Sequence, residues 1–343
     1  VSALRCHSMR QIWNAALYTA GSWPMLRSAR ARHGPVWLDL RITAHCNFQC
    51  LHCPCGTPAA EPSFPDMSMD LFLAILDRFP SALALTLAGG EPLLHPKLFE
   101  IVWAAHRRRL KVHIPTNGSL LQRNLDLLRE APVEFLNVSL YGVDGASFSA
   151  VTGNEPSVFA RTVEALRKLT AGRKPGGYPK LIRTSYLCTK ANLSRIADFI
   201  RLCEEIGVDQ IKLKNFHYRG TPGLTGSLSL CGDDPAVQAF FEELGRQRFR
   251  VPVFLPRLWR GDVPRACTLP FRMLTIDGGG AIGPCCTEGP APRFGGCFAE
   301  PDVWNGATLT AARRVMLDPT APLPQACRLC EEMIRSRPSI GGR

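Results

Sequence analysis

The sequence lacks any apolar run that approaches the length of a membrane span, which takes about 20 residues. It also lacks internal repeats, low-complexity segments and the interleaving of aromatic with basic residues that is typical of single-strand RNA binding. These absences favour a globular chain without a transmembrane segment or a nucleic-acid partner. With 343 residues, of which 45% are apolar, the chain can bury the core of one large and one small domain.

Acidic residues are absent from the first 38 residues, although this segment contains five arginines: Arg5, Arg10, Arg27, Arg30 and Arg32. Such a basic segment is compatible with a transit peptide or a membrane-surface helix, but the long apolar region of a secretory signal is missing. Apolar residues at helical spacing favour a helical lead-in over residues 1–35 that packs on the next domain. These residues are Ile12, Ala15, Ala16, Tyr18 and Leu26.

Cysteine is abundant, with 14 residues, and its spacing is typical of metal sites. Cys46, Cys50 and Cys53 form a C-x₃-C-x₂-C triplet that can hold three irons of a [4Fe–4S] cluster and leave the fourth iron open. Zinc is the alternative, because His45 or His52 would complete a set of four ligands. An iron–sulfur cluster needs a reducing compartment, which predicts a cytoplasmic protein.

Three further motifs follow the triplet in a fixed order: Leu85-Thr-Leu-Ala-Gly-Gly-Glu-Pro, Ile114-Pro-Thr-Asn-Gly-Ser and Asn137-Val-Ser-Leu-Tyr-Gly. Together with the cysteines they resemble the radical S-adenosylmethionine (SAM) superfamily. In that family the open iron chelates SAM, and an electron from the cluster yields a 5′-deoxyadenosyl radical that abstracts hydrogen from a C–H bond. A carboxylate pairs with an ammonium, and glycine permits close backbone approach. The Gly-Gly-Glu-Pro motif therefore suits the SAM ammonium.

The resemblance assigns the SAM site to six residues: His52, Gly89, Gly90, Glu91, Asn117 and Ser139. It places the glycines and Glu91 at the SAM ammonium, and Ser139 at the ribose or the carboxylate. His52 is placed near the adenine, with a solvated loop histidine as the alternative.

Strand-like runs alternate with helical patterns through the first two thirds of the chain. The strands lie near 36–44, 83–89, 111–116, 134–141, 180–188 and 210–216, and the helices near 68–79, 97–109, 119–130, 156–171 and 192–206. This alternation predicts an α/β fold with a parallel sheet, and Ser68 and Asn192 are expected N-caps. Six units match the partial (β/α)₆ TIM-like barrel of the radical SAM family, over residues 36–217, with chemistry at the C-terminal strand ends. A connecting segment with one helix follows at 218–265.

The C-terminal part contains cysteines for a second site: Cys267, Cys285, Cys286, Cys297, Cys327 and Cys330. Cys267 and Cys285 flank a glycine turn at Gly280, and this C-x₁₂-G-x₄-C pattern resembles the hairpin of SPASM and twitch domains. The short tail after Cys330 matches the twitch form, over residues 266–343. The resemblance implies one auxiliary [4Fe–4S] cluster on Cys267, Cys285, Cys327 and Cys330.

Two alternatives remain open at this second site. A zinc ribbon-like site uses the same kind of ligands. Cys286 or Cys297 could also replace one of the four cluster ligands, and Cys286 is the nearer rival because it adjoins Cys285.

Twitch enzymes without a peptide-recognition domain include aminoglycoside and aminocyclitol epimerases and dehydrogenases, and the chain resembles these. Cys188, at the end of the fifth expected strand, favours an epimerase in which a thiol returns hydrogen to the opposite face, with a buried packing residue as the alternative. The other outcome is oxidation to a ketone, for which Lys212, Lys214 and His217 are candidate bases. A flavodoxin or ferredoxin is the expected electron donor.

The net charge of +12 is unfavourable for a polycationic aminoglycoside. Asp209, Asp277 and Glu288 are the carboxylates available to such a substrate. A peptide maturase is the second hypothesis, since a basic surface suits an acidic leader peptide. A non-catalytic electron-transfer protein is the third, and the open iron implied by the triplet speaks against it.

Overall fold

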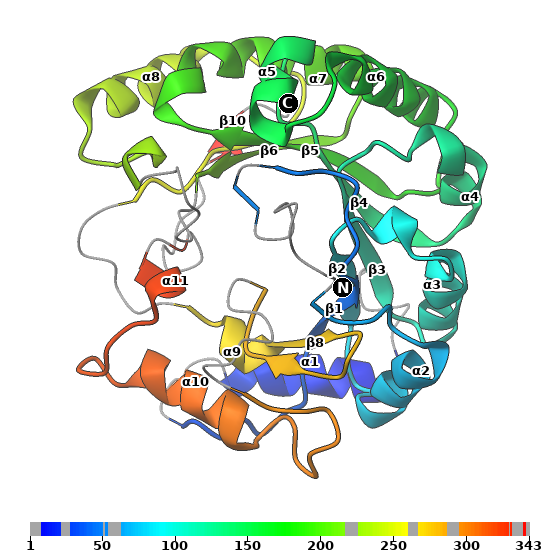
Figure 1. The fold of residues 1–343 in the computed structure, drawn as a ribbon. Coiled ribbons are helices and arrows are strands. Elements are labelled where there is room, and N and C mark those ends of the chain that lie inside the picture. The colour runs from blue at the N-terminus through cyan, green and yellow to red at the C-terminus, as the bar shows by residue number, and fades with distance from the viewer. Residues whose placement is uncertain are drawn as a thin grey trace.

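In the computed structural model, the described residues are 8–21, 28–50, 52–53, 63–216, 226–259, 267–286, 295–328, 330 and 339–340. Their strands form one ten-stranded sheet in the order β10-β7-β6-β5-β4-β3-β2-β1-β8-β9. The sheet curves around a central space, and helices cover its outer face (Figure 1). The expected α/β barrel class is confirmed.

The first six strands are parallel neighbours joined by helical crossovers, as expected. The strands are β1 (Trp37–Thr43), β2 (Ala84–Gly89), β3 (Lys111–Thr116), β4 (Val133–Ser139), β5 (Leu181–Cys188) and β6 (Gln210–Asn215). The helices are α2 (Met69–Arg78), α3 (Leu98–Arg107), α4 (Leu125–Glu130), α5 (Gly145–Thr152), α6 (Pro156–Ala171) and α7 (Ile196–Ile206). Short 3₁₀ helices are η4 (Pro92–Leu94), η5 (Gln122–Asn124), η6 (Lys190–Arg195) and η7 (Gly226–Leu228).

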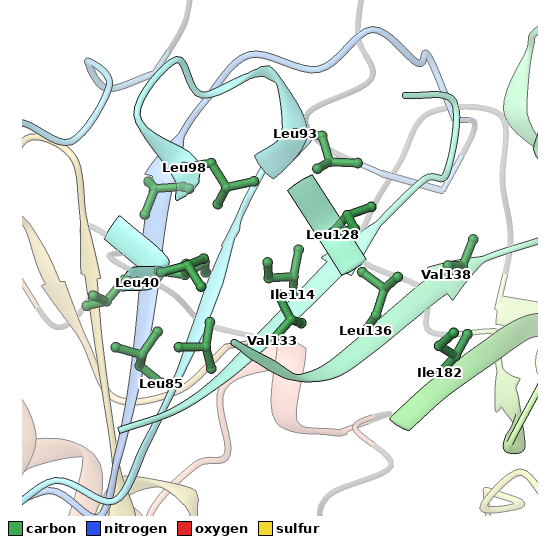
Figure 2. Packing of buried hydrophobic residues seen from close by; sticks show 14 of the residues in the cluster. Leu40, Leu85, Leu93, Leu98, Ile114, Leu128, Val133, Leu136, Val138 and Ile182 are labelled. Atoms are coloured by element: carbon green, nitrogen blue, oxygen red, sulfur yellow. The ribbon is translucent and has the colours of Figure 1, made fainter. Parts of the chain in front are cut away.

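Strand residues alternate between two environments, because successive side chains point to opposite faces of a sheet. Apolar residues such as Leu40, Leu85, Ile114 and Leu136 pack against the helices and are fully buried (Figure 2). The intervening positions face the barrel interior. This alternation places polar and charged residues of β1, β4, β5 and β6 inside the barrel.

A belt of aromatic rings in edge-to-face contact lies inside the barrel. The Trp37 and His113 ring centroids lie 4.6 Å apart, and those of His113 and Phe135 lie 5.2 Å apart. The Arg183 guanidinium lies 4.4 Å from the centroid of Phe135 and 5.1 Å from that of Phe254. Residues from β1, β3, β4, β5 and β7 (Val253–Phe254) therefore contact one another inside the barrel.

The C-terminal strands extend the barrel sheet. Strand β8 (Met273–Asp277) pairs in parallel with β1 and antiparallel with β9 (Ile282–Gly283), which confirms the expected glycine-turn hairpin. The other edge holds β7 and β10 (Ser339–Ile340). Helices α8 (Pro235–Arg246), α9 (Leu269–Arg272), α10 (Ala307–Leu317) and α11 (Gln325–Arg328) complete this part. The predicted domain boundary between residues 265 and 266 stays a prediction. Strand β8, which follows it, belongs to the same sheet as the barrel strands.

Buried Arg313 fixes α10 beside the hairpin. Its Nε donates to the carbonyl oxygen of Pro270 at 2.8 Å, and its guanidinium lies 4.3 Å from the Trp304 ring centroid. Burial lowers the pKa of Arg313 to about 10. The side chain thereby joins α10 to α9, close to the second set of cysteines.

The two expected helix caps have different outcomes. Ser68 caps α2 and accepts a hydrogen bond from the Leu71 amide at 3.1 Å, as expected. The expectation for Asn192 is wrong, because Thr189 is the N-cap and Asn192 lies inside the 3₁₀ helix η6 that precedes α7. The Asn192 side chain accepts from the Thr189 amide at 2.8 Å and so completes a capping box.

The N-terminal helix α1 (Met9–Gly21) docks through polar residues, whereas the sequence predicted apolar packing. Gln11 and Asn14 are buried, and Trp13 is 67% exposed. Gln11 donates to the carbonyl oxygen of Ala82 at 2.8 Å, and Asn14 donates to that of Ser81 at 3.0 Å. These amides satisfy loop carbonyls at the start of β2. No helix among the described residues has the length and hydropathy needed to span a membrane.

Replacing Asn14 with alanine should lower the free energy of unfolding by about 1–3 kcal/mol, because buried backbone groups then lose their partners. Urea unfolding followed by circular dichroism measures this change. Thr19→Ala is the control, since the exposed Thr19 hydroxyl donates to the Ala15 carbonyl oxygen within α1. Equal stability of both variants would show that α1 contributes little to the fold.

Because His113 is largely buried in this belt, we expect the stability of the fold to fall in acid. Burial, with help from Lys111 and Arg183, lowers the pKa of His113 to about 4, against about 6.5 in the unfolded chain. Since the folded pKa is the lower one, this stabilisation is present above pH 6.5 and is lost as the pH falls towards 4. The difference is worth about 3 kcal/mol.

His113→Phe should therefore lose less stability between pH 7 and pH 4.5 than the unmodified protein, as measured by urea unfolding at each pH. His106→Phe, at an exposed histidine, should keep the original pH dependence. The idea fails if His113→Phe shows the same acid sensitivity as the unmodified chain.

Candidate active site

The cysteine triplet lies in the loop that leaves the C-terminal end of β1. Cys46 and Cys50 are half-buried and pack against the core, and the Cys53 amide donates to the Cys50 carbonyl oxygen at 3.0 Å. Burial, together with the Cys53 and Cys46 thiolates, raises the pKa of Cys50 to about 12. The three thiols therefore lie close enough to interact, and a bound cation would stabilise their ionised forms.

The end of β2 lies directly against this loop. The Gly90 amide donates to the Thr43 carbonyl oxygen at 2.9 Å, and the Glu91 amide donates to that of His45 at 2.8 Å. A Cβ atom at Gly90 would overlap the His45 carbonyl oxygen, and one at Gly89 would overlap that of Thr43. Both glycines are therefore required for close packing between β2 and the cysteine loop.

Glu91 joins three motifs through one buried carboxylate. Its Oε1 accepts from Thr116 Oγ1 at 2.7 Å and from the Leu93 amide at 3.1 Å, and its Oε2 accepts from the Asn117 amide at 2.6 Å. Burial raises the pKa of Glu91, and these hydrogen bonds act in the opposite direction. A carboxylate has about four acceptor positions. The three described donors leave room for one more, which fits an ammonium group.

Asn117 extends this network to the cysteine loop. Its Nδ2 donates to Asn47 Oδ1 at 2.9 Å, and Asn47 Nδ2 donates to Ser119 Oγ at 2.9 Å. Asn47 directly follows Cys46. The polar end of β3 therefore holds the loop that contains the cysteines.

His52 and Ser139 also lie near this edge. The His52 ring contacts the Tyr141 ring edge-to-face, with centroids 5.2 Å apart, just beyond the end of β4. Ser139 is the last residue of β4, is half-buried and pairs in register with Ser185 of β5. The structure thus brings the residues expected to bind SAM to the C-terminal ends of β1 to β4. Their individual roles stay predictions.

The second set of cysteines gathers around the open end of the β8–β9 hairpin. Buried Cys267, Cys285 and Cys330 form one cluster with Leu269. Cys327 joins Cys330 in a turn, since the Cys330 amide donates to its carbonyl oxygen at 3.2 Å. Among the described residues, no group of three or more His, Cys, Asp or Glu side chains is arranged to hold a single metal ion.

Cys286 and Cys297 differ from the cysteines of this cluster in exposure. Cys297 bridges to Ala281 at the turn end of the hairpin and is exposed. Cys286 is also exposed, and its carbonyl oxygen accepts from Arg41 at 2.8 Å. The assignment of Cys267, Cys285, Cys327 and Cys330 as the second ligand set stays a prediction, and these four thiols are less exposed than Cys286 and Cys297.

Cys188 has no exposed surface and belongs to the hydrophobic core. It lies on the same face of β5 as Thr184 and Tyr186, which contact Cys203 and Phe199 of α7. The strand alternation therefore turns Cys188 towards the helices. This placement opposes its expected role as a thiol facing the substrate and favours the packing alternative.

The candidate carboxylates are scattered. Asp209 forms a two-point ion pair with Arg173, with both N–O distances 2.6 Å, at the start of β6 and away from the strand ends. Asp277 accepts from the Gly279 and Ala281 amides in the hairpin turn. Glu288 and the candidate base His217 lie outside the described residues.

The sequence analysis missed two interior residues of β1. Asp39 is buried, accepts from Thr275 Oγ1 at 3.2 Å, and has its pKa raised by burial. Arg41 follows it on the same face. The signal was the alternation in Trp37-Leu-Asp-Leu-Arg-Ile-Thr, which places every second residue inside the barrel.

Comparison with known proteins shows which proteins this chain is similar to. Residues 40–203 match the model of the Radical SAM superfamily. The chain is 32% identical over 181 residues to the AdoMet-dependent heme synthase of Methanosarcina barkeri, covering 51% of this chain and 49% of that protein. It is 27% identical over 233 residues to the probable GTP 3′,8-cyclase of Saccharolobus islandicus, covering 66% and 72%. The chain thus spans about half the length of the first relative.

Solved structures share the fold at low identity. The SAM-bound SuiB structure from Streptococcus suis has a TM-score of 0.64 and 16% identity, covering 86% of this chain and 71% of SuiB. The structure of anSMEcpe with AdoMet and the Cp18Cys peptide has a TM-score of 0.57 and 14% identity, covering 86% and 88%. These similarities show that the chain shares the fold of these two structures.

Iron content tests the two cysteine sets. Alanine at Cys50 or at Cys285 should each remove about four irons per chain from a reconstituted protein that holds about eight, because each set would bind one [4Fe–4S] cluster. Iron and sulfide assays on anaerobic protein measure the loss.

The matched controls are Cys286→Ala and Cys297→Ala, which should keep the full iron content because both residues are exposed and neither belongs to the proposed ligand sets. A loss of four irons in Cys286→Ala would contradict the proposed ligand set and make Cys286 a ligand.

Proposed function

Residues 40–203 match the model of the Radical SAM superfamily, and on this similarity we propose that the protein is a radical SAM oxidoreductase that dehydrogenates a carbinol carbon inside the barrel. The radical SAM family uses SAM and a [4Fe–4S] cluster. The observation that carries the proposal is the convergence of Glu91, Thr116 and Asn117 on the loop of the cysteine triplet. Both ends of the proposed SAM site would thereby lie at one edge of the sheet.

Different residues of the chain would bind the cluster and SAM. Cys46, Cys50 and Cys53 would hold the cluster, and the Glu91 carboxylate would accept the SAM ammonium in its remaining acceptor position. Ser139 would donate to the ribose or the carboxylate. When bound, the cluster supplies the electron that cleaves SAM reductively, and a flavodoxin or ferredoxin is the proposed source of that electron.

The second cysteine set supports an oxidation. Four thiolates from Cys267, Cys285, Cys327 and Cys330 would hold an auxiliary [4Fe–4S] cluster with no open iron, which suits an electron carrier. A dehydrogenated alcohol gives up one hydrogen atom, one proton and one electron. Lys212 and Lys214 are the described candidates to take the proton, since both face the interior from β6.

Epimerisation remains the alternative, but it needs a thiol at the substrate. Cys188 was the expected donor, and its burial against α7 weakens that reading. The aminoglycoside-like substrate also loses support, because Asp209 is occupied by Arg173 far from the strand ends. An uncharged or acidic cyclitol is therefore favoured over a polycation.

A peptide maturase is the second candidate function. The observation that favours it is the fold similarity to SuiB, which has been solved with its precursor peptide SuiA at a TM-score of 0.62. Peptide recognition would place a peptide side chain at the same strand ends.

Product mass distinguishes these reactions. Anaerobic protein should be incubated in D₂O with SAM, reductant and a panel of cyclitols, sugars and aminoglycosides. Dehydrogenation predicts 5′-deoxyadenosine together with a product lighter by about 2 Da, and Cys188→Ala should keep the rate within about twofold because it touches no substrate. Liquid chromatography with mass spectrometry gives both readouts.

Incorporation of one deuterium at carbon, abolished in Cys188→Ala, would overturn dehydrogenation and establish epimerisation. Cleavage of SAM with every small molecule unchanged would move the test to peptides. No 5′-deoxyadenosine from cluster-loaded protein would refute the radical SAM activity itself.

A further inference from the structure

Helix α1 is amphipathic in the reverse of the usual sense. Its buried side carries the amide side chains of Gln11 and Asn14. On the opposite side, Met9 is 80% exposed and Trp13 is 67% exposed. Met9, Trp13 and exposed Ala16 are spaced at i, i+4 and i+7, so they lie on one face of the helix. The apolar face of α1 therefore points away from the protein.

This face lies at the end of the barrel opposite the cysteine triplet. Gln11 donates to the carbonyl oxygens of Arg108 at 3.2 Å and Arg109 at 3.4 Å, just before β3. Asn14 donates to that of Pro35 at 3.3 Å, just before β1. The triplet follows the other end of β1, whose seven residues span about 23 Å. Helix α1 is therefore too far from the proposed active site to take part in the reaction.

Positive charge borders the apolar face of α1. Arg10 belongs to the helix, and Arg109 belongs to the turn that the helix contacts; both are exposed. The first 38 residues contain no Asp or Glu. Asp77, which reaches the same turn, is already paired with Arg108 at 2.6 Å. The surface around the apolar face is therefore basic.

The backbone of Arg109 is in the left-handed region, with φ +61°. Helices α5 and α7 end at left-handed residues too, but these are Gly153 and Gly207, with φ +70° and +83°. Glycine is favoured in this conformation because it has no Cβ atom, and an arginine is strained there. Among the residues that the structure describes, Arg109 alone combines a side chain with a left-handed backbone. An exposed arginine at such a position indicates a use for its charge.

The shape and charge of this surface fit a membrane that contains anionic lipid. A helix with Trp and Met beside Arg can bury its apolar side chains among the lipid headgroups, while its guanidinium groups contact the phosphates. An electron donor or a peptide substrate would instead have to reach the strand ends at the opposite end of the barrel. A helix that projects from the protein offers a partner no groove of its own.

We propose that the α1 face, formed by Met9, Arg10, Trp13 and Arg109, binds the surface of a membrane that contains anionic phospholipid. The end of the barrel that carries the proposed active site then faces away from the membrane. This binding is independent of the reaction, because none of the four residues belongs to either set of cysteines or to the proposed SAM site.

Co-sedimentation with vesicles tests the proposal on the full chain, loaded with iron and sulfide under anaerobic conditions. Vesicles of phosphatidylcholine with about a quarter phosphatidylglycerol should bind the protein, and each arginine near such a surface strengthens binding about fivefold. Vesicles of phosphatidylcholine alone should bind it at least about tenfold more weakly. High salt should weaken binding to the anionic vesicles, because it screens the arginines.

Loss of the apolar side chains tests insertion. Met9→Ser/Trp13→Ser should bind the anionic vesicles about tenfold more weakly, because the buried part of the helix is lost. Leu73→Ser is the control, since Leu73 is 37% exposed on α2 and should be dispensable for vesicle binding. Urea unfolding should give the same stability for the double variant and the unmodified protein, because Met9 and Trp13 are exposed.

Loss of charge is tested separately. Arg10→Gln/Arg109→Gln should bind the anionic vesicles at least about tenfold more weakly and with less salt dependence. Arg161→Gln/Arg201→Gln is the matched control, because it removes the same two charges from exposed positions on α6 and α7. These helices lie across the ring of helices from α1 (Figure 1). The control should bind like the unmodified protein.

No binding to anionic vesicles, equal binding to neutral ones, or unchanged binding of both double variants would overturn the proposal. Self-association in sedimentation velocity that Met9→Ser/Trp13→Ser abolishes, without vesicle binding, would assign the face to a second copy of the chain. Binding of a polyglutamate peptide through Arg10 and Arg109, again without vesicle binding, would assign it to an acidic polypeptide. Either result would overturn the membrane proposal.

Formation of 5′-deoxyadenosine separates this proposal from the proposed function. All variants with intact iron content should form it at the rate of the unmodified protein, because their substitutions lie far from the cysteine triplet. If the unmodified protein cleaves no SAM while vesicle binding still depends on the α1 face, the proposed function fails and the membrane site stands.

Discussion

The structure of the site depends on one buried carboxylate. Glu91 accepts hydrogen bonds from Leu93, Thr116 and Asn117, and its own amide donates to His45 in the cysteine loop. Removing it would leave several buried donors without a partner, which costs more than the hydrogen bonds themselves contribute. The same group that orders β2, β3 and the cysteine loop is the one placed to receive an ammonium. Structural integrity and ligand binding therefore cannot be separated at this position.

A second constraint is the alternation of the strands. It directs apolar residues to the helices and leaves the interior to charged and aromatic ones, which include the edge-to-face rings around His113 and the two lysines of β6. The alternation also explains why the side chains of Cys188 and Lys212 lie on opposite faces of the sheet. Cys188 lies on the helix face of β5, whereas Lys212 lies on the interior face of β6.

Much of this could be predicted from the sequence, because the barrel strands and the Cys-x-x-x-Cys-x-x-Cys loop depend on local patterns. The hairpin at Gly280 was predictable for the same reason. The burial of Cys188 against the helices was not predictable, since the end of a strand considered without its register does not reveal which face a side chain takes. The docking of α1 through Gln11 and Asn14 depends on carbonyls of a loop some 70 residues away, which no local pattern contains.

The most direct test of the central claim is the electron paramagnetic resonance spectrum of reduced protein in which Cys267 and Cys285 are replaced by alanine, recorded with and without SAM. If Cys46, Cys50 and Cys53 hold a cluster with an open iron, SAM should change the spectrum of the remaining cluster. Glu91→Gln, with its iron content verified, should need a higher SAM concentration for the same change, because the ammonium loses a charged partner. A spectrum that saturating SAM leaves unchanged would contradict the account.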